Sequence, residues 1–150
     1  MEAEKEPLST KPFKPMRALV LPGGGGRGAY QVGVVKALLE RGIEFDLAFG
    51  TSIGGINAAL LAQGSLQRLE KLWGNITGRD VFSLPSAHQI GRLVLGHKLG
   101  LLDNQPLELL LRREIDLQRV KSSSMKVGWC TTDLCSLETR LITIDEISTT

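Results

Sequence analysis

The chain has 150 residues, of which 42% are hydrophobic and 23% charged, a balance typical of a folded globular protein of about one domain. With 18 Lys and Arg against 16 Asp and Glu, the formal net charge is only +2. This charge excludes the strongly basic surface that nucleic-acid binding requires, so no nucleic-acid partner is expected.

The first residues differ in composition from the rest of the chain. Residues 1–15 mix Glu, Lys and Pro without an apolar run, which predicts a disordered leader before one domain over residues 16–150. The charge-free stretch 47–67 is too often interrupted by Gly, Ser, Asn and Gln to predict a membrane-spanning helix.

Cys130 and Cys135 have no second pair of ligands beside them, and the two histidines stand elsewhere in the chain, so a four-ligand zinc site is not favoured and no metal or cofactor is expected. We interpret Cys130 and Cys135 as small buried apolar side chains in a reducing compartment, with a local disulfide as the alternative. This interpretation favours a cytoplasmic location.

Strand and helix signals alternate along the chain. Residues 17–21 and 47–49 are apolar runs that predict buried parallel strands, and helical spacing predicts helices over 28–41 and from Ile56 to about Gly64. Ser65 is a candidate cap for a further helix through Trp73. This alternation predicts the α/β class, a parallel sheet with helices on both faces.

The second half is less regular. Glycines and a proline interrupt residues 76–102, and then Asp103 or Asn104 is a candidate cap for a helix that tolerates Pro106 in its first turn and extends to Ile115. Residues 125–131 and 139–144 predict two strands around a short connection.

A block of glycines follows the first strand and leads into the first helix. Such a loop allows close backbone approach and presents the free N–H groups of a helix N-terminus, so it suits a phosphate or a developing oxyanion. Its residues are Gly23, Gly24, Gly25, Gly26, Arg27 and Gly28.

The second strand leads into a G-x-S-x-G turn made of Gly50, Thr51, Ser52, Ile53 and Gly54. A serine on such a strand-to-helix turn is typical of a nucleophile elbow, in which small neighbours let the two backbones converge. Ser52 is therefore the candidate nucleophile, and a simple helix N-cap is the alternative.

One other interpretation of the glycine block is open. Gly23, Gly25 and Gly28 fit the dinucleotide pattern G-x-G-x-x-G, with Glu44 or Asp46 as the acid, although that acid stands at the beginning of its strand. A nucleotide P-loop is excluded because Gly28 is not followed by Lys and then Ser or Thr.

Taken together, the glycine block and the serine turn resemble the patatin-like phospholipases, in the right order and separation. Residues 29–40, 101–107 and 125–140 extend the resemblance, which covers about residues 17–144. It implies a three-layer parallel-sheet patatin-like hydrolase fold, incomplete at the C-terminus. It also implies hydrolysis of phospholipid or lysophospholipid esters, at a membrane surface, by a serine–aspartate dyad. A non-catalytic lipid-binding remnant is a further alternative.

The family's catalytic aspartate lies in an Asp-Gly turn, and no aspartate of this chain precedes a glycine. Asp46 is excluded because it lies roughly 20 Å along the strand from Ser52. Asp133 is the best internal substitute, although it also suits a turn cap. We therefore expect weak activity from these 150 residues alone. The chain stops just after a predicted strand, where an alternating sheet would continue, which favours an incomplete gene product over a pseudoenzyme.

The remaining candidates are weaker. Arg27 either steadies the loop or meets a lipid phosphate, and it is equally consistent with a solvated charge. His88 and His97 lack an orienting carboxylate, so surface positions are favoured over a triad. The apolar pieces 93–95 and 99–102 are candidates for a lipid-facing rim or for core packing.

Overall fold

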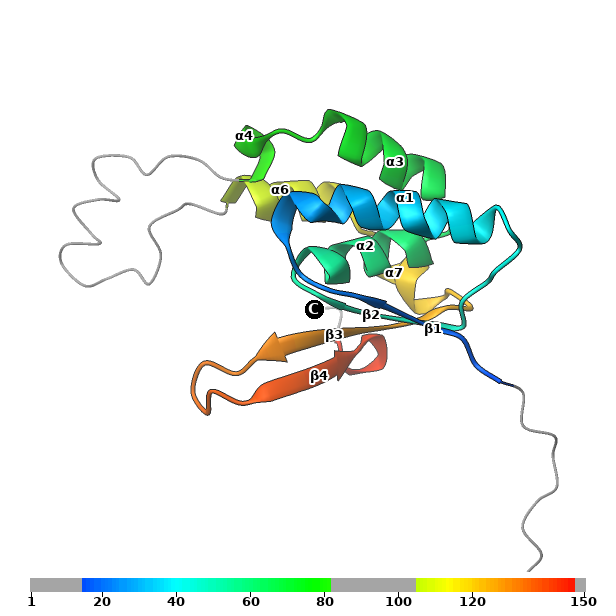
Figure 1. Ribbon diagram of the computed structural model, residues 1–150. Coiled ribbons are helices and arrows are strands. Elements are labelled where there is room, and N and C mark those ends of the chain that lie inside the picture. The colour runs from blue at the N-terminus through cyan, green and yellow to red at the C-terminus, as the bar shows by residue number, and fades with distance from the viewer. Residues whose placement is uncertain (1–14, 82–104, 148–150) are drawn as a thin grey trace, which may run out of the picture.

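A computed structural model describes residues 15–81 and 105–147 of the chain. Its sheet has the order β1 (Ala18–Leu21), β2 (Leu47–Thr51), β3 (Lys126–Thr132) and β4 (Thr139–Thr143) (Figure 1). The first three strands are parallel and β4 is antiparallel to β3. The predicted α/β class with a mainly parallel sheet is confirmed; β4 reverses because its connection to β3 is too short for a crossover.

The helices follow the predicted order. The described helices are η1 (Gly25–Arg27), α1 (Gly28–Leu39), α2 (Ile53–Ala62), α3 (Leu66–Asn75), α4 (Gly78–Val81), α6 (Gln105–Glu114), α7 (Leu117–Lys121) and η2 (Ile144–Glu146). The predicted helices correspond to α1, α2, α3 and α6, with Pro106 in the first turn of α6. The short α7, which Asp116 caps by accepting from the N–H groups of Gln118 and Arg119, was not predicted.

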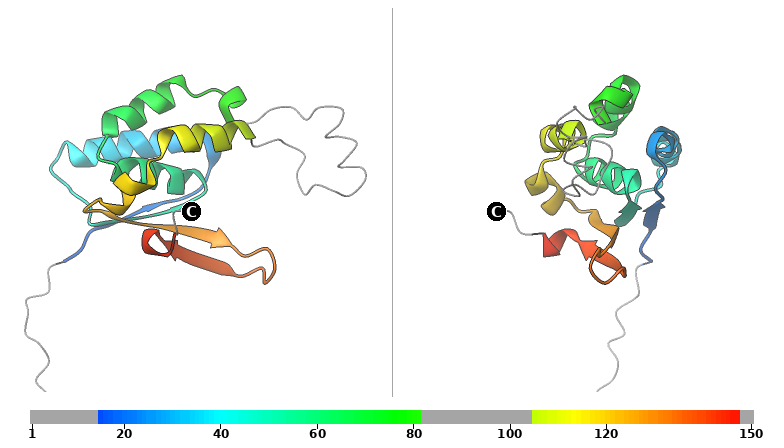
Figure 2. Two further views of the ribbon diagram at one scale, coloured as in Figure 1. Left: turned by 180° about the vertical axis from the view of Figure 1, so that it is seen from behind. Right: turned by 90° about the vertical axis from the view of Figure 1, so that its left-hand side faces the viewer.

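All the described helices lie on one side of the sheet (Figures 1 and 2). Leu19 and Leu21 point into this side and are buried, whereas Val20 between them is 73% exposed. Within residues 15–81 and 105–147, no helix covers the opposite face. The described residues thus show helices on one face of the sheet, and the expected helices on the other face stay a prediction.

Helix α2 occupies the centre of this layer, between the sheet and the outer helices (Figure 2). Its Ala58 and Ala59 are at most 2% exposed, and Leu69 of α3 and Val127 of β3 belong to the same core. The small side chains let α2 lie close to the sheet, which fixes the position of the turn from which it starts.

Both cysteines are free thiols rather than a disulfide. The expectation that they are buried was wrong: Cys130 is half-buried on β3, and Cys135 is exposed in the turn that joins β3 to β4. Of the helices described, none is long and apolar enough to cross a bilayer.

Several expectations fall outside the described residues. These are the leader, the cap at Asp103 or Asn104, the positions of His88 and His97, and the segments 93–95 and 99–102.

Candidate active site

Ser52 stands between the last residue of β2 and the first residue of α2. Its backbone has φ 52° and ψ −123°, a left-handed conformation that is strained for any residue except glycine, at a cost of about 1–3 kcal/mol. The residue is exposed, and its side chain makes no capping hydrogen bond to α2. The alternative of a simple helix cap therefore fails, because the hydroxyl does not satisfy the helix N-terminus.

The two glycines of the serine turn are required by close backbone packing. A Cβ atom on Gly50 would collide with the backbone of Gly54 and Gly55, and a Cβ atom on Gly54 would collide with the carbonyl groups of Leu21 and Pro22. The prediction that strand and helix backbones converge around the serine is confirmed in these contacts.

The glycine block passes beside Ser52. A Cβ atom built on Gly23 would lie 3.5 Å from Cβ of Ser52. Gly24 and Gly25 have φ values of 144° and 55°, which side chains rarely adopt. The two glycines of the loop that have positive φ thus lie where the loop passes the serine.

The N–H groups of this loop divide into two sets. Arg27 donates its N–H to the Gly24 carbonyl (3.1 Å), and Gly28 donates to the Gly25 carbonyl. Within the described part of the chain, no residue accepts from the N–H of Gly25 or Gly26, as expected at a helix start. These two donors are free to hold a ligand oxygen.

The other residues of the two motifs support the turn. Thr51 ends β2 and is exposed, and Ile53 begins α2 and is half-buried. Arg27 is exposed, and its aliphatic part lies against Gly24. Gly28 begins α1 so close to Trp73 and Ile53 that a Cβ atom would collide with both.

A buried polar network fixes the glycine block to α2. Asn57 of α2 donates to the Gly28 carbonyl (3.1 Å) and to Oε1 of Gln31 (2.9 Å), and it accepts from Nε1 of Trp73 (2.9 Å). Gln31 in turn donates to the Pro22 carbonyl (2.6 Å). Both amides are more than nine-tenths buried. The network therefore binds both ends of the loop to the helix that carries Ser52.

Ser52 opens onto an apolar cavity of about 460 Å³, within the range of small-molecule sites. Three helices, α2, α3 and α6, supply most of the wall, and α4 completes it. The lining residues are Gly25, Gly26, Ser52, Ile53, Ile56, Asn57, Leu60, Leu72, Trp73, Ile76, Thr77, Gly78, Val81, Leu107, Leu110, Leu111 and Glu114. Ser52 and the two free N–H groups thus share one cavity.

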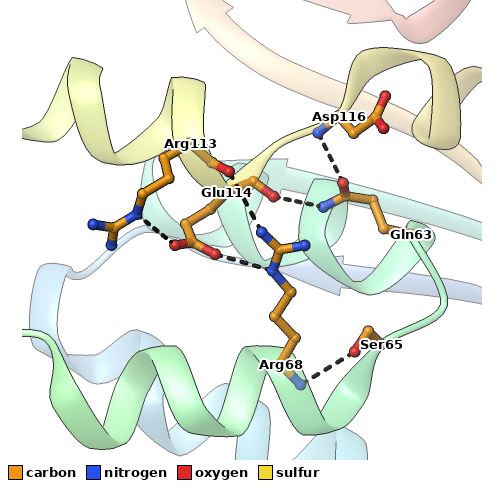
Figure 3. A network of polar contacts seen from close by, with 6 residues as sticks. All are labelled: Gln63, Ser65, Arg68, Arg113, Glu114 and Asp116. Atoms are coloured by element: carbon orange, nitrogen blue, oxygen red, sulfur yellow. Dashed lines mark hydrogen bonds and ion pairs between the residues drawn. The ribbon is translucent and has the colours of Figure 1, made fainter.

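Glu114 is the single ionisable group in this lining, and it belongs to the polar network of Figure 3. Its carboxylate accepts from Nε of Arg68 (3.0 Å) and Nε of Arg113 (2.8 Å). Burial by itself raises the pKa of Glu114, but the hydrogen bonds from Arg113 and Arg68 outweigh it and hold the pKa below its ordinary value. The cavity therefore carries one fixed negative charge at neutral pH.

The candidate base Asp133 is engaged elsewhere. Its carboxylate accepts from the N–H groups of Cys135 (2.8 Å) and Ser136 (3.2 Å), and it caps the turn between β3 and β4. Asp46 precedes β2, at the end opposite Ser52, and accepts from the N–H of Arg17 (2.8 Å). Neither carboxylate lines the cavity, and no cluster of three metal-binding side chains occurs in the residues described.

Sequence reasoning missed Gln31, Asn57, Trp73 and Glu114. The first two had a signal: each is an uncharged amide on an otherwise apolar helical segment, where a polar group requires a buried partner. Glu114 had none, because it looks like a surface residue beside two arginines.

A family profile described as "Patatin-like phospholipase" matches residues 19–137. "Lysophospholipase nte1" of Aspergillus terreus is 41% identical over 87 residues, which are 55% of this chain and 6% of that protein. "Patatin-like phospholipase domain-containing protein 7" of Rattus norvegicus is 56% identical over 46 residues, 31% of this chain and 3% of that protein. The chain thus spans a small fraction of these relatives.

Two solved structures share the fold at low sequence identity. VipD from Legionella pneumophila matches 87% of this chain and 39% of its own, with a TM-score of 0.57 and 15% identity. The type III effector protein ExoU matches 87% of this chain and 36% of its own, with a TM-score of 0.52 and 18% identity.

Proposed function

The chain belongs to the patatin-like phospholipase family, and we propose that it supplies the nucleophile and the oxyanion loop of a serine lipid acyl hydrolase. Its substrates would be phospholipid or lysophospholipid esters, presented at a membrane surface. The observation that carries the proposal is a strained, exposed Ser52 that lines the same apolar cavity as Gly25 and Gly26, whose N–H groups have no acceptor among the described residues.

The reaction would follow the chemistry of an activated serine. Oγ of Ser52 attacks the ester carbonyl, and the oxyanion that forms accepts hydrogen bonds from the N–H groups of Gly25 and Gly26. The alcohol leaves with a proton, and the acyl group stays on Ser52 until water hydrolyses it. Because α2 begins next to Ser52, its N-terminal dipole further stabilises the negative charge.

The base that takes the proton of Ser52 would come from an Asp-Gly turn, as the family resemblance implies. None of the six aspartates in the 150 residues precedes a glycine, and Asp133 is held in its own turn. General-base assistance contributes about 10²–10⁴ in rate, so the present residues alone would turn over slowly.

Labelling with a fluorophosphonate tests the nucleophile. We expect Ser52 to be phosphonylated and Ser52→Ala to be inert. The matched control is Ser65→Ala, which removes another serine at a helix N-terminus and should leave labelling intact. Equal labelling of wild type and Ser52→Ala would refute the assignment.

A second comparison tests the base. Ester hydrolysis by these 150 residues should be far below that of a patatin-like phospholipase whose sequence contains the Asp-Gly turn. Robust hydrolysis by the 150 residues that disappears in Asp133→Asn would instead identify Asp133 as the base.

A dinucleotide-binding module is not favoured. The glycine block faces Ser52 and an apolar cavity, and Asp46 lies at the other end of β2. Calorimetry with NAD or FAD should therefore detect no binding. Binding that Ser52→Ala leaves unchanged would support this rival.

A further inference from the structure

The cavity has a direction along α2. Ile53, Ile56 and Leu60 lie on successive turns of one face of this helix, so the wall extends about 12 Å from Ser52 at 1.5 Å per residue. On α6 the lining residues Leu107, Leu110 and Leu111 also follow helical spacing. The apolar lining is therefore elongated along α2.

Glu114 lies at the end of this space that is remote from Ser52. Gln63, which directly follows α2, donates to the Glu114 carbonyl (3.2 Å), so the last residue of α6 lies beside the last turn of α2 (Figure 3). Arg68, which binds the Glu114 carboxylate, is in the first turn of α3, whereas Trp73 further along α3 reaches Asn57 and Gly28 near the loop. Helix α3 therefore runs antiparallel to α2 and brings its arginine to the remote end.

The Glu114 carboxylate is held firmly in this position. Arg68 and Arg113 occupy one oxygen each, and the side chain is 14% exposed. An alkyl chain placed against this carboxylate would remove its remaining contact with water and would offer no new hydrogen bond, which is unfavourable. An alkyl chain that fills the cavity would therefore stop at this carboxylate.

We propose that the acyl chain of the substrate lies along α2 in this cavity and that Glu114 sets the longest chain that fits. The inference rests on the proposed function, because it places the ester at Ser52. The proposal assigns the selection of acyl-chain length to an ion pair between α3 and α6, which lies outside both glycine motifs.

Binding of saturated straight-chain fatty acids, from medium to long chains, tests this without requiring turnover. They are titrated against a bound fluorescent fatty acid. In the wild type, affinity should rise about fourfold for each methylene that enters the cavity and then stop rising at a limiting length. In Glu114→Leu the affinity should keep rising to longer chains than in the wild type. In Glu114→Gln the limiting length should increase by a smaller amount.

Two further variants control for folding and for nonspecific effects. Leu111→Phe adds volume one turn before Glu114 and should shorten the limiting length. Glu108→Leu removes an exposed carboxylate of the same helix, paired with Arg112 outside the cavity lining, and should change nothing. The same limiting length in wild type, Glu114→Leu and Leu111→Phe, or no fatty-acid binding, would overturn the proposal.

These results separate the inference from the proposed function. Limiting lengths that shift as expected, together with equal labelling of wild type and Ser52→Ala, would support the cavity and refute the nucleophile. Labelling of Ser52 with an unchanged limiting length in Glu114→Leu would support the nucleophile and refute the role of Glu114.

Discussion

Ser52 and Ser65 occupy the same position in two neighbouring helices, the N-cap, but their backbones and hydrogen bonds differ. Ser65 has an ordinary φ of −125° and accepts from the N–H of Arg68 (3.2 Å), so it stabilises α3. Ser52 has φ 52° and no capping bond. A serine before a helix therefore identifies a cap only when its own backbone conformation allows one.

The difference arises from what surrounds each serine. Around Ser52, the contacts of Gly50 and Gly54 with neighbouring backbone force the turn, and the core holds α2 against the sheet. Ser65 follows Gly64, whose positive φ of 76° ends α2 in open space. Strain at Ser52 is thus imposed by packing, while Ser65 follows local preference.

The largest expected effect concerns the loop that faces Ser52. Gly25→Ala forces a side chain onto a residue with φ 55° and should displace its N–H, which reduces the rate of fluorophosphonate labelling about 10²–10³-fold. Gly64→Ala imposes the same kind of backbone strain at φ 76°, away from the cavity, and should leave that rate unchanged. Equal rates in the two folded variants would show that the loop has another role.

A large loss of stability is expected from Gly54→Ala. The new Cβ would collide with the Leu21 and Pro22 carbonyls, and we expect the free energy of unfolding to fall by at least about 3 kcal/mol. The control is Gly33→Ala, at an exposed position of α1 with open space around it, which should stabilise by about 0.5–1 kcal/mol. Urea unfolding measures both; a stable Gly54→Ala would contradict the packing described.

The two serines themselves should respond in opposite directions. Ser65→Ala should lower the free energy of unfolding by about 1 kcal/mol through loss of the cap. Ser52→Gly should raise it by about 1 kcal/mol, because glycine relieves the positive φ, and should abolish labelling. Destabilisation by Ser52→Gly would mean that Ser52 is not strained.

The smallest effect is the pH dependence of the Glu114 cluster. Because the folded chain lowers the pKa of this carboxyl, its contribution to stability is present above the ordinary carboxyl pKa and disappears as pH falls through the lowered value. Glu114→Gln should therefore destabilise at neutral pH and have little effect in acid. Thermal unfolding against pH checks this; a difference that grows in acid would refute the sign.

The sequence allowed prediction of the features that depend on local chemistry. The apolar runs of β1 and β2, the cap at Ser65 and the close approach at Gly50 and Gly54 each follow from residues near in sequence. The network around Asn57 and the position of Glu114 depend on how α1, α2, α3 and α6 pack, which local patterns do not encode. The same holds for the face of the sheet around Val20, which none of the described helices covers.

The most direct test of the account is to locate the fluorophosphonate adduct by mass spectrometry of the digested protein. We predict a phosphonyl group on the peptide that contains Ser52, and much slower formation of this adduct when a fatty acid of limiting length fills the cavity before labelling. An adduct on another serine, or one that forms at Ser52 equally fast with and without the fatty acid, would contradict the shared site of nucleophile and apolar cavity.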